Sequence, residues 1–247
     1  MKQLIIIFLV FSFQFLTLHS FAQTVLLEQD VNADTIPAIE GPNMKNYNHW
    51  YMSYGFVLGN SEGDGGDVLM GISGEYLFGL RYKRKINNNL AIGLGLHYGW
   101  VNYFVQQDSS KTFPNSEQHK TERLVYNNIG AEGYFRINYG KRGNHIGNFF
   151  DLGAYGEWGY LINHITKDKH DPAQVGAGMV QVKRSRLQYV NRVNYGAMMR
   201  VGFNRYVLYG KYRLSNLFKE DYPTSENSLN YPEFPRIVAG IEIGLFE

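Results

Sequence analysis

The stretch Ile92-Gly-Leu-Gly-Leu-His-Tyr-Gly-Trp100 alternates at every step between large apolar residues and smaller or polar ones. Successive side chains of a β-strand point to opposite faces of the sheet, so a repeat of two residues gathers one kind of side chain on each face. An amphipathic helix would instead repeat its apolar residues every three or four positions. The stretch therefore predicts a β-strand with one apolar face.

Seven further segments show the same alternation, which makes eight predicted strands in all. The residues on their apolar faces are Trp50, Met52, Tyr54, Phe56 and Leu58; Ile72, Tyr76, Phe78, Leu80 and Tyr82; Val125, Ile129, Ala131, Phe135, Ile137 and Tyr139; Phe150, Leu152, Ala154, Trp158, Tyr160 and Ile162; Tyr189, Val193, Tyr195, Ala197, Met199, Val201 and Phe203; Tyr206, Leu208, Tyr212 and Leu214; and Ile237, Ala239, Ile241, Ile243 and Leu245.

The connections between these segments are alternately long and short. Short polar turns are predicted at 84–89, at 140–147 and around Asn204, and longer loops at 60–67, 106–122, 166–186 and 218–234. Outer-membrane barrels have short periplasmic turns and long extracellular loops. The chain is therefore predicted to be all-β, an eight-stranded antiparallel up-and-down transmembrane β-barrel with both termini in the periplasm.

Charged residues are absent from the apolar faces and common on the opposite ones. The opposite faces carry Glu75, Arg81, Lys83, Glu132, Arg136, Asp151, Glu157, Arg192, Arg200, Lys211, Arg213, Arg236 and Glu242. A soluble barrel would bury its apolar face and expose its charges. A sandwich sheet, the alternative, also has one apolar face but does not explain the alternating connections.

These charged residues are predicted to form a network of ion pairs inside the barrel. An eight-stranded barrel is only wide enough for its side chains, and unpaired buried charges are strongly destabilising. Five glycines on the same faces would give the arginines room: Gly93, Gly95, Gly99, Gly153 and Gly159. We therefore expect a filled lumen that does not conduct ions.

The N-terminus has the three parts of a secretory signal peptide. Lys2 precedes the apolar run 4–18, and Ser20-Phe21-Ala22 places small residues at the −3 and −1 positions of a cleavage site. Cleavage is expected before Gln23. The predicted organisation is thus a signal peptide at 1–22, a flexible periplasmic leader at 23–47 and an outer-membrane barrel at 48–247.

The composition excludes several classes of function. The chain of 247 residues has no cysteine, which excludes disulfides, thiolate metal sites, cysteine nucleophiles and a lipid anchor on cysteine. Its 24 basic and 22 acidic residues give a net charge of only +2, which disfavours nucleic acid as a partner.

The segment Tyr209-Gly-Lys-Tyr-Arg-Leu-Ser-Asn-Leu-Phe218 and the closing strand Ile237-Val-Ala-Gly-Ile-Glu-Ile-Gly-Leu-Phe246 resemble the small outer-membrane β-barrel proteins of the Bacteroidota, sometimes grouped as PorT-like barrels. The end of the signal peptide, Phe21-Ala22-Gln23, is similar too. The closing strand resembles the aromatic-ended signal of the barrel-insertion machinery, although Glu247 follows Phe246. The resemblance implies fold and outer-membrane location, and no single activity.

The sequence gives little support to two candidate sites, one for hydrolysis and one for a metal. Lipid A deacylases, which are also outer-membrane barrels, carry a His-x-Ser-Asn segment, whereas this chain has Arg213-Leu-Ser215-Asn216, and arginine cannot act as the general base. A metal at His164, Asp168, His170 and Asp171 lacks a recognised ligand spacing. No catalytic, cofactor-binding or metal site is predicted, and the basic run 183–186 is interpreted as a solvated loop or a contact to lipopolysaccharide.

Two hypotheses of function follow. The barrel is a structural or interaction component of the cell envelope, with outer-membrane lipid, lipopolysaccharide and an envelope protein as partners, in one version associated with a secretion or motility apparatus. Alternatively it is a small-solute pore. We expect the first, because the lumen is predicted to be filled.

Overall fold

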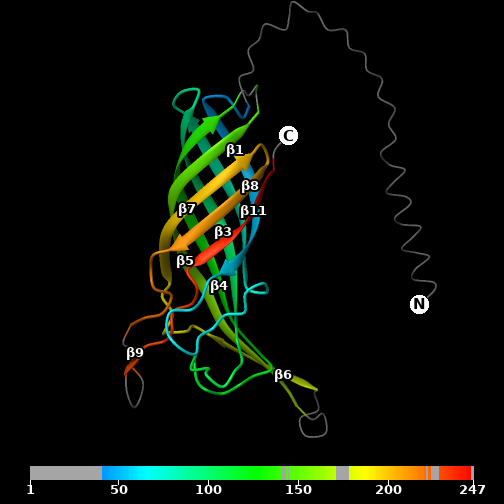
Figure 1. Cartoon of the computed structure of the whole chain (residues 1–247), viewed down its shortest axis with the longest axis vertical. Helices are drawn as coiled ribbons and strands as arrows, with labels where there is room; N and C mark the ends of the chain where they lie inside the picture. The colour runs from blue at the N-terminus through cyan, green and yellow to red at the C-terminus, as the bar shows by residue number, and fades with distance from the viewer. Residues whose placement is uncertain are drawn as a thin grey trace, which may run out of the picture. The chain divides into compact units, whose positions relative to one another are not determined.

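The structure is a computed structural model that describes residues 41–140, 143, 145–170, 178–220, 222–223 and 228–245. These residues contain no helix, and none therefore that could cross a membrane. Figure 1 shows the strands, which are β1 (Asn46–Leu58), β2 (Gly74–Lys85), β3 (Leu90–Val105), β4 (Thr121–Tyr139), β5 (Asn148–Lys169), β6 (Met179–Ser185), β7 (Val193–Phe203), β8 (Tyr206–Arg213), β9 (Tyr222–Pro223), β10 (Ser228–Leu229) and β11 (Ile237–Leu245).

Eight of these strands form a closed antiparallel ring. Each strand pairs with the next in the order β1, β2, β3, β4, β5, β7, β8 and β11, and β11 pairs back with β1 through Trp50–Leu245 to Leu58–Ile237. The prediction of an eight-stranded up-and-down barrel is confirmed. The predicted signal peptide and residues 23–40 of the leader lie outside the described residues.

The last residues of the predicted leader are part of the barrel. β1 begins at Asn46 instead of 48, and the backbone N–H of Lys85 donates to the carbonyl of Lys45 at 2.7 Å. The buried Lys83 ammonium donates to the carbonyl of Pro42. Residues 42–45 therefore pack against the end of the barrel that carries the short turns.

Most of the described residues of the loop expected at 166–186 lie in strands. β5 continues to Lys169 and pairs with β6 from Asn163–Ser185 to Lys169–Met179, so the two extend beyond the ring as a hairpin. Both faces of this hairpin mix apolar with polar or charged residues, as Val180, Val182 and Arg184 do on one face of β6, and its sequence therefore lacks the alternation that identifies the strands of the wall. Its backbone ladder holds it in strand form.

A β-bulge in β5 reverses the alternation that the sequence predicts. Asn127 and Asn128 of β4 face Leu161 and Gly159, so Tyr160 is the extra residue. Tyr160 and Leu161 are both exposed, and Ile162 is 6% exposed instead of facing outward as expected. A single inserted residue moves every following side chain to the other face.

The outer face of the ring is apolar over all eight strands. The most exposed large side chains include Leu94 (65%), Leu96 (63%) and Val193 (61%), although they are hydrophobic. Aromatic side chains lie toward both ends of this face: Tyr54, Tyr76, Trp100 and Trp158 toward the long loops, and Tyr82, Tyr139, Phe203 and Tyr206 toward the short turns. With charged residues inside, this is the arrangement of a transmembrane β-barrel.

Side chains from the neighbouring strand pack directly over the inward-facing glycines. A Cβ at Gly93 would lie 2.2 Å from the Tyr134 ring, and a Cβ at Gly202 would lie 2.1 Å from Phe149. Each glycine is the direct cross-strand partner of the ring that covers it. The atoms nearest to the five predicted glycines belong to tyrosines, to Glu132, Asn128 and Met198 and to the backbone, and not, as predicted, to the arginines.

Candidate functional site

The middle of the lumen is filled by a network of arginines and carboxylates. Glu132 on β4 accepts from Nε of Arg81 at 2.9 Å and from Nη1 of Arg200 at 2.6 Å. Asp151 on β5 accepts from Nε of Arg136 at 2.7 Å and from Nε of Arg200 at 3.1 Å. All five side chains are almost completely buried, so each charge depends on its partners.

Glu242 completes this layer from the other side of the ring. Its carboxylate accepts both terminal nitrogens of Arg81 in a bidentate pair. Such parallel hydrogen bonds between charged groups are among the strongest in proteins. The layer contains three arginines and three carboxylates (Arg81, Arg136, Arg200, Glu132, Asp151 and Glu242) and is formally neutral.

A second layer lies closer to the long loops. Nζ of Lys211 is 2.6 Å from Oε1 of Glu75 and 2.5 Å from Oε1 of Glu157. Nε2 of His97 lies 3.4 Å from the same Glu157 oxygen. His97 also faces the lumen, a role that the sequence analysis did not assign to it although its position in β3 has the inward parity.

Two predicted members of the lumen network lie elsewhere. Arg192 is exposed and precedes β7, and Asn194 occupies the inward position. Arg236 precedes β11 and pairs with Glu62, whose side chain is 60% exposed, at the mouth of the barrel. Lys83 is buried at the opposite end, where it donates to the Pro42 carbonyl and lies 5.7 Å from the centroid of the Tyr47 ring. The network of ion pairs inside the barrel therefore contains fewer residues than predicted.

Little space remains between these side chains. The two cavities described inside the barrel measure about 20 and 10 Å³, and they are lined by residues of the two charged layers and by Tyr51, Tyr103 and Tyr126. A cavity needs roughly 10–15 Å³ to hold one water molecule. Each of these two cavities therefore has room for about one water molecule.

The loops at the long-loop end fold over the mouth of the barrel, and we call the described residues of 59–73, 106–120, 186–192 and 214–236 the cap. Phe113 is fully buried at its centre, with the rings of Phe218 and Phe234 both 4.9 Å away. Tyr189, predicted on the outer wall, instead stacks on Phe218 within this cluster. The main apolar cluster is therefore shared between the cap and the ends of the ring strands next to it, where Val57, Val105 and Leu124 pack against the cap residues.

Buried charges also anchor the cap. Lys111 donates to Glu122 at 2.9 Å and to the carbonyl of Asn115 at 2.9 Å, and Glu122 lies 2.6 Å from Nε2 of His164. Burial raises the pKa of Glu122, but hydrogen bonds from His164, Lys111 and Gln107 outweigh this effect and lower that pKa below 4.5. This cluster fixes the 106–120 loop to β4 and β5.

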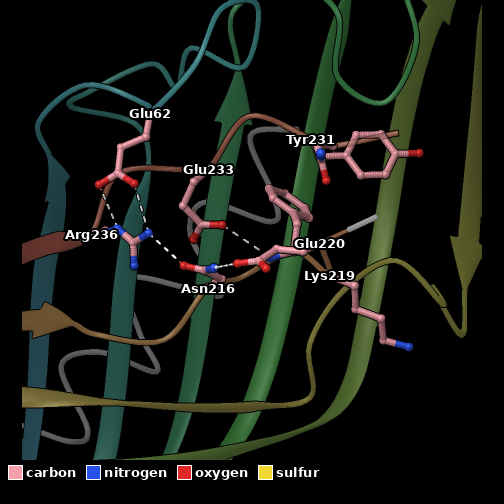
Figure 2. A pocket seen from close by; sticks show the side chains of 9 residues that line it. Glu62, Asn216, Lys219, Glu220, Tyr231, Glu233 and Arg236 are labelled. Carbon is pink, nitrogen blue, oxygen red and sulfur yellow. Dashed lines mark hydrogen bonds and ion pairs between the residues drawn. The ribbon is translucent and has the colours of Figure 1, made fainter. Parts of the chain in front are cut away.

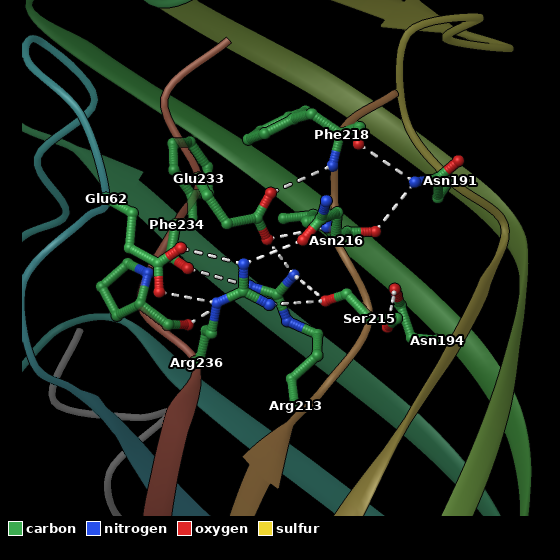
Figure 3. A network of polar contacts seen from close by, with 12 residues as sticks. Glu62, Asn191, Asn194, Arg213, Ser215, Asn216, Phe218, Glu233, Phe234 and Arg236 are labelled. Carbon is green, nitrogen blue, oxygen red and sulfur yellow. Dashed lines mark hydrogen bonds and ion pairs between the residues drawn. The ribbon is translucent and has the colours of Figure 1, made fainter. Parts of the chain in front are cut away.

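A second anchor joins β8 to the loop that precedes β11. Arg213 pairs with Glu233 and donates to the carbonyl of Phe234 at 2.9 Å, while Glu233 accepts from the backbone N–H of Leu217 at 2.7 Å (Figure 3). The sequence analysis placed Glu233 in a loop and missed this role. No local pattern identifies it, because its partners come from another strand.

A pocket of about 300 Å³ opens in the cap. It is lined by Glu62, Asn216, Phe218, Lys219, Glu220, Asn230, Tyr231, Glu233 and Arg236. A chain of hydrogen bonds crosses it, in which Arg236 donates to Glu62 at 2.8 and 2.9 Å and to Asn216 at 2.8 Å, and Asn216 donates to Glu220 at 2.7 Å (Figure 2).

Among the described residues, the hydrogen-bond partners of the Ser215 hydroxyl include no general base. Its hydroxyl donates to Asn194 at 3.0 Å and accepts from the backbone N–H of Tyr195 at 3.1 Å, and Arg213 is engaged with Glu233. These contacts are structural.

Two of the four residues considered for a metal site have separate partners in the structure. His164 contacts Glu122, Asp168 contacts His119, and Asp171 lies outside the described residues. In the part of the chain that the structure describes, no three His, Asp or Glu side chains form a group that could hold a metal.

No family model and no curated protein matches the chain. Among solved structures, it is similar to Ail, the attachment invasion locus protein of Yersinia pestis, crystallised with the heparin analogue sucrose octasulfate. The two share 11% identity over 81% of this chain and 96% of Ail, with a TM-score of 0.29. We draw no conclusion from a likeness at that TM-score.

Proposed function

We propose that the chain is an integral outer-membrane protein whose barrel is a closed support for the cap, and that it acts as a structural or interaction component of the cell envelope. The observation that carries the proposal is the filled lumen: six arginine and carboxylate side chains occupy one layer, and the two cavities described beside them hold about one water each. This filling supports a barrel that does not conduct solutes.

The outer wall supports the membrane location. Its exposed side chains are apolar, with aromatic residues toward both ends, as lipid contact requires. Outer-membrane lipid, lipopolysaccharide and the barrel-insertion machinery are then its first partners. The long-loop end with the cap faces the exterior, and both ends of the barrel chain lie on the periplasmic side.

The cap supports a role in interaction. Its loops are held by buried ion pairs and by a cluster of aromatic rings, so its surface is preorganised, which lowers the entropic cost of binding. An envelope protein is the partner we propose, in one version a component of a secretion or motility apparatus.

Two experiments test these statements. Purified protein in a planar bilayer should show no reproducible single-channel steps, and discrete conductance would instead support the small-solute pore. Crosslinking of the intact protein in outer membranes, followed by purification and mass spectrometry, should recover a defined envelope protein. Recovery of insertion machinery alone would contradict the proposed partner.

A further inference from the structure

The cap pocket has a distinctive balance of donors and acceptors. Nε, Nη1 and Nη2 of Arg236 are all engaged, with Glu62, with Asn216 and with the carbonyl of Ser215 at 3.1 Å. The guanidinium therefore has little capacity left for an anion. Lys219 is the one further cation of the lining, and Figure 2 shows its side chain directed away from the carboxylates.

The hydrogen-bonding groups of the pocket that can still bind a ligand are mainly acceptors. Glu220 is exposed and, among the described residues, accepts one side-chain hydrogen bond, from Asn216. Glu62 is 60% exposed and receives one hydrogen bond on each oxygen, from Arg236. Because a carboxylate has about four lone-pair sites, both groups can accept further hydrogen bonds from a ligand.

The net charge of the pocket and its aromatic lining restrict the class of ligand further. The lining carries three carboxylates and two cations, and Arg213 behind Glu233 makes the set formally neutral. Tyr231 lines the pocket and is half-buried, held by Tyr189 and Phe218 at ring distances of 5.0 and 5.8 Å. A firmly held aromatic ring beside hydrogen-bond acceptors suits a ligand with an apolar face and many donors.

We propose that the cap pocket binds a neutral saccharide, whose hydroxyl groups donate to Glu62 and Glu220 and whose C–H face packs against Tyr231. The volume of about 300 Å³ lies at the small end of ligand pockets, so it admits a short saccharide or the end of a longer glycan. A phosphate or sulfate group would meet three carboxylates and a guanidinium that is already engaged, and an aliphatic ligand would leave the remaining acceptor sites of Glu62 and Glu220 unused. This inference names the class of ligand for the proposed interaction function. It rests on that function, because the pocket is exposed at the cell surface only if the barrel is in the outer membrane.

The test is saturation-transfer NMR on the full protein in phosphocholine micelles, which contain no sugar headgroup. The probes are glucose, galactose, mannose, N-acetylglucosamine and their disaccharides, with inorganic phosphate as the anionic comparison. We expect transfer to the ring C–H protons of at least one saccharide, and no competition by phosphate. Transfer to none of them, or displacement by phosphate, would overturn the proposal.

Two variants locate the site. Glu220→Ala removes a charged acceptor and should weaken binding about tenfold or more, since hydrogen bonds to charged groups contribute about 1.5–3 kcal/mol. Glu117→Ala removes an exposed carboxylate of the cap outside the pocket and should leave binding unchanged. Equal affinity in the two variants would also overturn the proposal.

A heat-dependent gel shift of each variant shows whether the barrel is folded. A folded barrel that binds no saccharide contradicts this inference and leaves the proposed function standing, whereas a chain without the shift contradicts the membrane barrel itself.

Discussion

Nη2 of Arg81 lies 2.9 Å from Oε2 of Glu242, although the strands that carry them, β2 and β11, are separated by β1. The pair therefore spans the seam where the last strand closes on the first. It links the closure of the ring to the charge balance of the lumen, because the same Arg81 also holds Glu132 on β4. Loss of one member leaves a buried charge without its partner.

Glu132→Ala should destabilise the barrel by about 3–5 kcal/mol, because it leaves Arg81 and Arg200 with one carboxylate fewer in a buried site. The free energy of unfolding in urea, followed by the heat-dependent gel shift, measures this. Glu117→Ala, which removes an exposed charge, serves as the control. A Glu132→Ala barrel as stable as that control would show that the network does not support the fold.

Leu94→Arg should impair assembly, at a cost of roughly 2–4 kcal/mol if the site lies near the bilayer midplane. Leu94 is 65% exposed on the apolar outer face, where an arginine would have to enter lipid. The fraction of folded protein after refolding into lipid vesicles is the measurement, with Leu94→Ile as the matched control. Equal folding of the two variants would argue against lipid contact at this position.

Gly93→Ala should cost about 1–3 kcal/mol, since the new Cβ would lie 2.2 Å from the Tyr134 ring. Gly133→Ala is a matched control, because its Cβ would meet only Leu94 Cδ2 at 3.8 Å. The midpoints of thermal unfolding compare the two. A Gly93→Ala variant as stable as Gly133→Ala would mean that Tyr134 can leave its position at no cost.

Acid should loosen the 106–120 loop. The folded pKa of Glu122 is lower than its ordinary value of 4.5, so its contribution is present above that value and is lost as the pH falls through the folded pKa. Hydrogen exchange of the loop amides should therefore show more opening below pH 4.5, after correction for the intrinsic rate. Glu122→Gln should already be loosened at neutral pH and respond less to acid; an unchanged acid response would point to another group.

The alternation of residues determined the number of ring strands and which face is apolar, and the alternately long and short connections determined their antiparallel order. Trp50 to Leu58 and Ile92 to Trp100 show why, since parity along a strand follows from backbone geometry alone. Parity also identified most of the charges that point inward, including Arg81, Glu132 and Arg200.

Only the tertiary structure decided which charges meet. Parity gives the face of a residue but not its height in the ring, which depends on the stagger between strands, so the pairing of Arg81 with Glu242 had no local signal. The bulge at Tyr160 and the exposed position of Arg192 likewise depend on how neighbouring strands pair. The cap pocket joins Glu62 to Arg236, which are far apart in the chain, and folding alone brings them together.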